Sequence, residues 1–227
     1  MSRKHKNNGN GNGNGQVYKQ TNKEFKPKTR GQEEYVRGII ESDITFCTGP
    51  AGSGKTACAV GIACEHLLKD KVKNIVITRP VLESGRQGLG FLPGDMYAKI
   101  HPYLIPILDE MYIYLGKYNT ENKMQNGMIS VAPLEYMRGR NFHNSFIIID
   151  EAQNATLSQL KMALTRIGRN STVVVTGDIS QSDLYDDQNG LKICIEKLDG
   201  VRGVSIIQLC DADIIRNGII SRILAKL

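Results

Sequence analysis

The 227-residue sequence has no apolar run of 18 or more residues, so we expect no membrane-spanning helix. Its first residues also lack the apolar core of a signal peptide, and we therefore expect a cytoplasmic protein. None of the five cysteines forms a C-x-x-C pair, and no cluster of His and Cys has the spacing of a zinc site. We expect buried, free thiols and no structural zinc.

Basic charge is concentrated at one end of the chain. Residues 1–30 carry eight Lys or Arg residues and one Glu, which leaves residues 31–227 with a net charge near zero. The segment also contains an Asn-Gly run, residues 7–15, that has no apolar face and should be disordered. We expect a disordered basic tail over residues 1–30, which either gathers nucleic acid or serves as a solubilising spacer, and one folded domain over residues 31–227.

One eight-residue segment matches G-x-x-x-x-G-K-[ST], the phosphate-binding P-loop. Its residues are Gly49, Pro50, Ala51, Gly52, Ser53, Gly54, Lys55 and Thr56. Glycines bring backbone N–H groups close to phosphate oxygens, Lys55 can reach the β- and γ-phosphates, and Thr56 can be a ligand of Mg²⁺. The alternative is a glycine-rich turn that caps an ordinary helix. A predicted strand before the segment and an apolar helix after it favour nucleotide binding.

Further strands and helices alternate along the chain. Short apolar, β-branched runs predict strands at residues 43–48, 74–78, 128–132, 146–149, 172–176 and 204–209. Helices are predicted at residues 32–40, 56–68 and 95–118, the last interrupted by Pro102 and Pro106, and from a capping box at Thr156 to Gly168. This order predicts an α/β fold, with a parallel sheet covered by helices on both faces.

Polar groups follow two of these strands. Asp150 and Glu151 directly follow the predicted strand at residues 146–149. Asp150 could hold the Mg²⁺ ion there, and Glu151 could activate a water. Gln181 follows the predicted strand at residues 172–176, where it could contact the γ-phosphate or the attacking water. The alternatives are a solvated acid pair that caps the next helix and a plain polar turn. The upstream P-loop favours the catalytic interpretation because carboxyl ends of parallel strands share one edge.

The ordered motifs resemble those of superfamily 1 helicase-type ATPases and, more closely, the PhoH-like family. The segments that carry this resemblance are Gly49 to Thr56, Arg79 to Val81, Gly88 to Gly94, Pro133 to Arg140, Asp150 to Asn154, Leu164 to Gly168 and Gly177 to Gln181. Together they extend through residues 31–222. The chain is identified as a single-domain member of the kind that also occurs in phages.

The resemblance implies a RecA-like P-loop NTPase fold that binds ATP and Mg²⁺ and hydrolyses ATP. It suggests Gln32 as an adenine contact, Thr56 and Asp150 for the metal, Glu151 for the water and Gln181 for the γ-phosphate. It also implies helicase-like work on RNA or single-stranded nucleic acid, a link to phosphate starvation and, for a phage protein, the host cytoplasm. The length leaves no room for the nuclease or KH domain of larger relatives.

A cation that neutralises transition-state charge increases the rate of phosphoryl transfer by about 10³–10⁵-fold. A two-lobed helicase supplies it from its second lobe, which this chain lacks. We favour Arg166 and Arg216, because we expect each to flank the surface formed by the carboxyl ends of the strands. At Arg216, however, the sequence departs from the family's Arg-His-Pro run. Either an arginine acts within the chain or a neighbouring subunit provides it. Our hypothesis is a homo-oligomer, a hexameric ring, with sites between subunits.

Two other functions remain open. The protein could be a nucleotide-dependent switch or assembly protein that remodels a protein partner, or a kinase that transfers the γ-phosphate to a small molecule. Arg79, Arg86 and the basic-aromatic stretch 136–142 are candidates for a nucleic-acid path, whereas a turn packed on the sheet edge is the alternative for that stretch.

Overall fold

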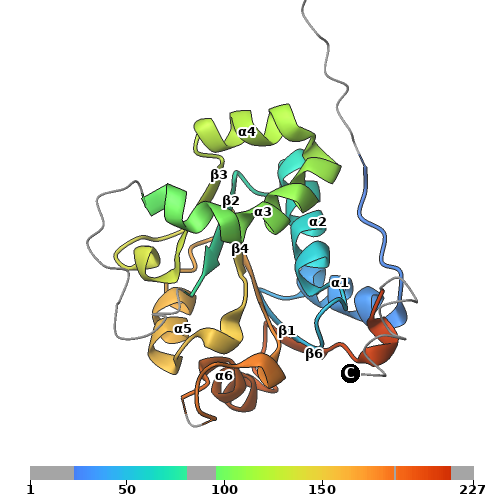
Figure 1. Ribbon diagram of the computed structural model, residues 1–227, viewed down its shortest axis with the longest axis vertical. Helices are drawn as coiled ribbons and strands as arrows, with labels where there is room; N and C mark the ends of the chain where they lie inside the picture. Colours follow the sequence, from blue (N-terminus) through green and yellow to red (C-terminus); the bar gives the residue numbers. More distant parts are fainter. Residues whose placement is uncertain (1–22, 81–95, 187, 216–227) are drawn as a thin grey trace, which may run out of the picture.

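The computed structural model describes residues 23–80, 96–186 and 188–215, with the backbone alone for residues 96–104 (Figure 1). Six strands form one sheet, and every strand pair in it is parallel. They are β1 (Ile44–Thr48), β2 (Asn74–Arg79), β3 (Ile129–Pro133), β4 (Ser145–Ile149), β5 (Thr172–Gly177) and β6 (Val204–Gln208). Their order across the sheet is β3-β2-β4-β5-β1-β6. The predicted parallel sheet is confirmed.

Helices cover both faces of this sheet, as predicted (Figure 1). One face carries α1 (Arg30–Glu41), α2 (Lys55–Leu68), α3 (Met96–Leu115) and α4 (Lys117–Gln125), and the other carries α5 (Leu157–Leu164) and α6 (Gly190–Leu198). No helix within the described ranges is long and apolar enough to cross a membrane.

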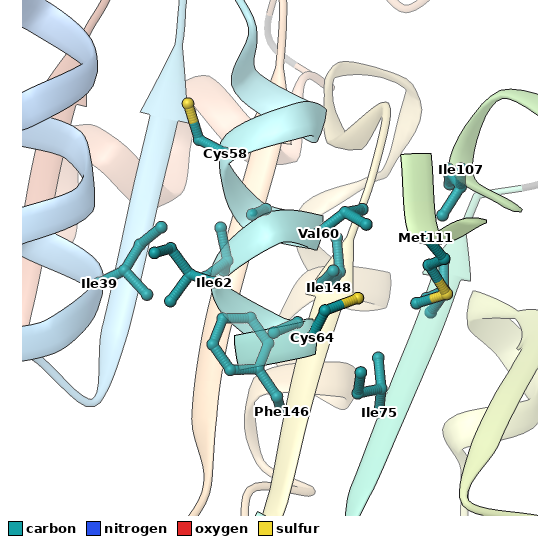
Figure 2. Close-up of a cluster of buried hydrophobic side chains, with 14 of the residues drawn as sticks. Ile39, Cys58, Val60, Ile62, Cys64, Ile75, Ile107, Met111, Phe146 and Ile148 are labelled. Atoms are coloured by element: carbon teal, nitrogen blue, oxygen red, sulfur yellow. The ribbon is translucent and has the colours of Figure 1, made fainter. Parts of the chain in front are cut away.

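Two apolar clusters form the core because side chains alternate along the central strand. Phe146 and Ile148 of β4 join the cluster under α1, α2 and α3, which Figure 2 shows in close-up. Ile147 and Ile149 point to the cluster under α5 and α6. The strand is therefore buried on both faces, which explains its uninterrupted apolar sequence.

Four helices differ from the sequence prediction. Pro102 and Pro106 do not interrupt α3, which continues through both positions. The capping box at Thr156 is present, but α5 ends at Leu164, before Gly168. Gly168 instead donates its backbone N–H to the carbonyl of Phe142, so this segment is already tied to the chain that enters β4. Helices α4 and α6 were not predicted.

The segment before α1 packs on the domain. Phe25, inside the predicted tail, places its ring 6.3 Å from that of Tyr114 on α3. A Cβ on Gly61 of α2 would lie only 2.5 Å from the Phe25 ring, so glycine makes room for this contact. The Asn-Gly run lies outside the described residues, and its disorder stays a prediction.

A buried carboxylate joins the two ends of the described chain. Asp213, which is 5% exposed, accepts hydrogen bonds from the hydroxyl of Thr29 (2.5 Å) and the backbone N–H of Cys210 (2.9 Å). Thr29 is the N-cap of α1, whereas Cys210 follows β6. These hydrogen bonds, with one from the Gly31 backbone, lower the pKa of Asp213 below its usual value.

Replacing this carboxylate should weaken the fold in a pH-dependent way. Because the folded-state pKa is depressed, the carboxylate stabilises the fold above its unfolded-state pKa, and this contribution is lost as pH falls through the folded-state pKa. Asp213→Asn leaves at least one donor without an acceptor, so we expect a loss of about 1–3 kcal/mol at neutral pH. Urea unfolding at several pH values checks this. A difference from wild type that stays constant into strong acid would contradict the argument.

Candidate nucleotide-binding site

The P-loop links β1 to α2 in a backbone conformation that favours glycine. Gly49, Gly52 and Gly54 have φ values of 148°, 85° and 87°, which L side chains rarely adopt. A Cβ on Gly49 would also lie 2.6 Å from the carbonyl oxygen of Leu209. The loop therefore passes close to the chain that leaves β6, and it ends at the N-terminus of α2, where the helix dipole favours an anion.

Segments from both ends of the described chain hold this loop. The side-chain amide of Gln32 donates to the carbonyl of Ser53 (2.9 Å) and accepts from the backbone N–H of Lys28 (2.9 Å). The backbone N–H of Ile215 donates to the carbonyl of Gly52 (3.1 Å). Gln32 is 3% exposed and lines a cavity of about 1210 Å³ beside α2. Its role as an adenine contact stays a prediction.

Lys55 lies over the loop. Its ammonium group donates to the carbonyls of Gly49 (2.6 Å) and Pro50 (2.9 Å). Partial burial lowers the pKa of Lys55, and nearby carboxylates, Asp178 first among them, oppose this effect. A cation with such neighbours is suited to an anionic ligand that would strengthen its charged form.

Asp150 connects the P-loop helix to the central strands. Its Oδ1 atom accepts hydrogen bonds from the hydroxyls of Thr56 (2.9 Å) and Thr176 (2.7 Å). The carboxyl is 6% exposed, and burial raises its pKa, while the two hydroxyl bonds partly oppose the rise. Both predicted metal ligands, Thr56 and Asp150, thus lie in direct contact.

Glu151 follows in the left-handed region, with φ of 53°. Its Oε2 atom accepts from the side-chain amide of Gln153 (2.6 Å), and its Oε1 atom lies 3.5 Å from a guanidinium nitrogen of Arg79. The amide oxygen of Gln153 accepts from the backbone N–H of Asp178 (3.2 Å). Gln153 therefore links Glu151 to the segment that leaves β5.

The strand order explains how distant motifs meet. β5 lies between β1, which leads into the P-loop, and β4, which ends at Asp150. The 3-10 turn Ile179–Gln181 after β5 therefore falls between the two. One cavity of about 270 Å³ collects most of the predicted site residues, and its lining includes Ala51, Gly52, Gly54, Lys55, Thr56, Asp150, Glu151 and Gln181.

The structure does not bring Arg166 to this cavity. The carbonyl of Arg166 accepts from the backbone N–H of Phe142, at the amino end of β4, whereas Asp150 follows the carboxyl end. The five-residue strand separates these ends by about 17 Å. The expectation that Arg166 flanks the carboxyl-end surface is therefore wrong. Its guanidinium instead contacts Met162 and Thr165. Arg216 and Arg86 lie outside the described residues.

Sequence reasoning missed two polar residues of the site. Thr176 donates to Asp150, and Gln153 bonds to Glu151 and to the segment after β5. Gln153 lies within the motif Asp150 to Asn154, and its burial, which would have indicated a polar network, is visible only in the structure. The sequence gives no indication that Thr176 belongs to the site, because β-branched residues are common in strands.

Comparison with known proteins places this architecture in a family. The model of PhoH-like proteins matches residues 24–227. The chain belongs to the PhoH-like family. A PhoH-like protein of Bacillus subtilis (strain 168) is 44% identical over 203 residues, which cover 89% of this chain and 63% of the relative. Protein PhoH of Escherichia coli (strain K12) is 39% identical over 200 residues, covering 87% and 56%. This PhoH-like chain thus spans less than two thirds of these relatives.

Solved structures support the fold assignment. The large terminase of a thermophilic bacteriophage aligns with a TM-score of 0.58 at 10% identity, covering 89% of this PhoH-like chain and 51% of the terminase. Another crystal form of that terminase, in complex with ADP, aligns with a TM-score of 0.54 at 8% identity, covering 88% and 50%. At such identities the likeness shows the shared P-loop NTPase fold alone.

Proposed function

We propose that this PhoH-like protein is a Mg²⁺-dependent ATPase whose hydrolysis is coupled to RNA or single-stranded nucleic acid. The observation that carries the proposal is the 2.9 Å hydrogen bond between Thr56 and Asp150. It joins the last residue of the P-loop to the first acid after β4. Glu151 lies next to this pair and lines the same cavity. A buried carboxylate at Asp150, followed by Glu151 in a left-handed conformation, is costly for the fold and is typical of a functional site rather than of a plain turn.

The residues fit a magnesium nucleotide. Oxygen ligands are what Mg²⁺ prefers, and Thr56 and Asp150 offer a hydroxyl and a carboxylate at one point. The left-handed glycines leave the loop backbone open to phosphate oxygens. When bound, the ion would neutralise charge on the β- and γ-phosphates. Thr56 and Asp150 would hold it, directly or through a water.

Each remaining side chain of the site has a separate proposed role in ATP hydrolysis. Lys55 would leave its contacts with the loop carbonyls and neutralise the β- and γ-phosphate oxygens. Glu151 would orient the attacking water and accept its proton. Gln181, on the segment after β5, would contact the γ-phosphate or that water. Gln32, beside the loop, would meet the adenine base.

The arginine that completes such a site is proposed to come from another copy of the chain. Arg166 cannot reach the cavity of its own subunit, so a contribution from it requires a neighbour. We therefore retain the homo-oligomeric, hexameric ring as part of the proposal, with Arg166 or Arg216 as the finger. Sedimentation of a monomer with the full ATPase rate would contradict this part.

Phosphate release from ATP tests the proposed function. The full chain is assayed with Mg²⁺ and with chelator, each alone and with single-stranded RNA or DNA. We expect release that requires Mg²⁺ and increases with a polynucleotide. Hydrolysis that no polynucleotide changes would favour a nucleotide-dependent switch or assembly protein, and label transfer to a small acceptor without phosphate release would favour a kinase.

A further inference from the structure

The carboxylate of Glu151 is held from two sides. The amide of Gln153 donates to Oε2 at 2.6 Å, and the guanidinium of Arg79 lies 3.5 Å from Oε1. Each oxygen of the proposed catalytic carboxylate thus has its own protein partner. A group that must orient a water needs at least one of its oxygens directed at that water.

The two partners differ in how firmly they are fixed. Gln153 is 2% exposed, and its amide oxygen accepts from the backbone N–H of Asp178. Both ends of its amide are therefore tied, and the side chain has no freedom to leave. The side chain of Arg79 is 32% exposed and that of Glu151 is 37% exposed. Their ion pair is open to solvent and to a competing anion.

The partners also lie on opposite sides of β4. Arg79 ends β2, which neighbours β4 on the side toward the sheet edge. Asp178, to which Gln153 is tied, follows β5, between β4 and the P-loop strand β1. Arg79 therefore draws the carboxylate away from the P-loop, and Gln153 keeps it toward the P-loop.

We propose that Arg79 and Gln153 are opposed positioning residues for Glu151, and that a nucleic-acid phosphate which takes Arg79 releases Glu151 for catalysis. The inference rests on the proposed function and explains how a polynucleotide would stimulate hydrolysis. A phosphodiester competes well for a guanidinium, because its two non-bridging oxygens, which share one negative charge, match the planar fork of donors. No movement of the strands is required, since only two side chains exchange partners.

Replacing Arg79 tests this mechanism. Arg79→Gln removes the ion pair that draws Glu151 away from the P-loop, so the rate of ATP hydrolysis without polynucleotide should increase about two- to fivefold, the factor expected for a solvent-accessible ion pair. KM for ATP should stay unchanged, because Arg79 does not contact the P-loop cavity. Stimulation by single-stranded RNA or DNA should be lost. Arg202→Gln, at an exposed arginine in the turn before β6, is the matched control and should leave both rates unchanged.

A double-mutant cycle separates positioning from a general structural effect. Gln153→Ala should lower the basal rate, and in that background Arg79→Gln should no longer raise it, because the opposing partner is gone. A lower basal rate in Arg79→Gln alone would overturn the inference, since Arg79 would then aid the chemistry. Stimulation retained in Arg79→Gln, or absent in wild type, would overturn it too. Mg²⁺-dependent ATP hydrolysis by wild type would leave the proposed ATPase intact in each case.

Discussion

Glu151→Gln should reduce ATP turnover by about 10²–10⁴-fold, the usual contribution of a positioned general base. The amide cannot accept the proton of the attacking water, although it has nearly the same shape and can still bond to Gln153. ATP binding should be kept or strengthened, because a negative charge near the γ-phosphate is removed. Single-turnover phosphate release and equilibrium binding of ATP measure the two effects separately.

A second acid provides the control for this variant. Glu196→Gln changes the same residue type on the exposed surface of α6, outside the cavity. Its turnover should equal that of wild type. Unchanged turnover in Glu151→Gln would remove Glu151 from the proposed mechanism, whereas loss of ATP binding would mean that its main role is to shape the cavity.

Asp150→Asn should abolish activity and yet make the nucleotide-free protein more stable. Both hydroxyl bonds, from Thr56 and Thr176, reach the same oxygen, Oδ1, so the amide oxygen of Asn can accept both. The negative charge is lost, and metal affinity should decrease by at least about 10- to 100-fold. At the same time, the cost of burying an ionised carboxylate disappears; this cost is what raises the pKa of Asp150.

The companion variant Asp150→Ala should have the opposite effect on stability. It also removes the charge, but it leaves the hydroxyls of Thr56 and Thr176 without their acceptor, at about 1–3 kcal/mol for the fully buried hydroxyl of Thr176. For a chain of this size, 1 kcal/mol shifts Tm by about 2–4 °C. Thermal unfolding in chelator should therefore show a higher Tm for Asp150→Asn and a lower Tm for Asp150→Ala. Equal shifts in one direction would contradict the burial argument.

The local pattern was enough to predict the parts of the site that lie close together in sequence. The P-loop, the acid pair Asp150-Glu151 and all six strands were predicted because each depends on short-range chemistry, namely glycine conformation, apolar β-branched runs and polar strand ends. The meeting of Thr56 with Asp150 also followed, since parallel strands present their carboxyl ends at one edge.

Two features of the site could not be predicted, because they depend on the path of the chain between strands and on the order of the strands in the sheet. Arg166 was expected to flank the carboxyl-end surface, but α5 ends at Leu164, and the chain that follows it, including Arg166, bonds to Phe142 at the other end of β4. The pairing of Arg79 with Glu151 needs β2 next to β4, and strand order is a property of the whole sheet. Neither is contained in a local pattern.

The backbone contacts of the P-loop make it depend on two segments that are far apart in the sequence. Gln32 holds the carbonyl of Ser53 from the first helix, and Ile215 holds that of Gly52 from the last described residues. The loop thus contacts both the first helix and the last described residues. Fraying of either segment would therefore loosen the loop before it disturbed the sheet, and a bound phosphate would resist that fraying in both segments.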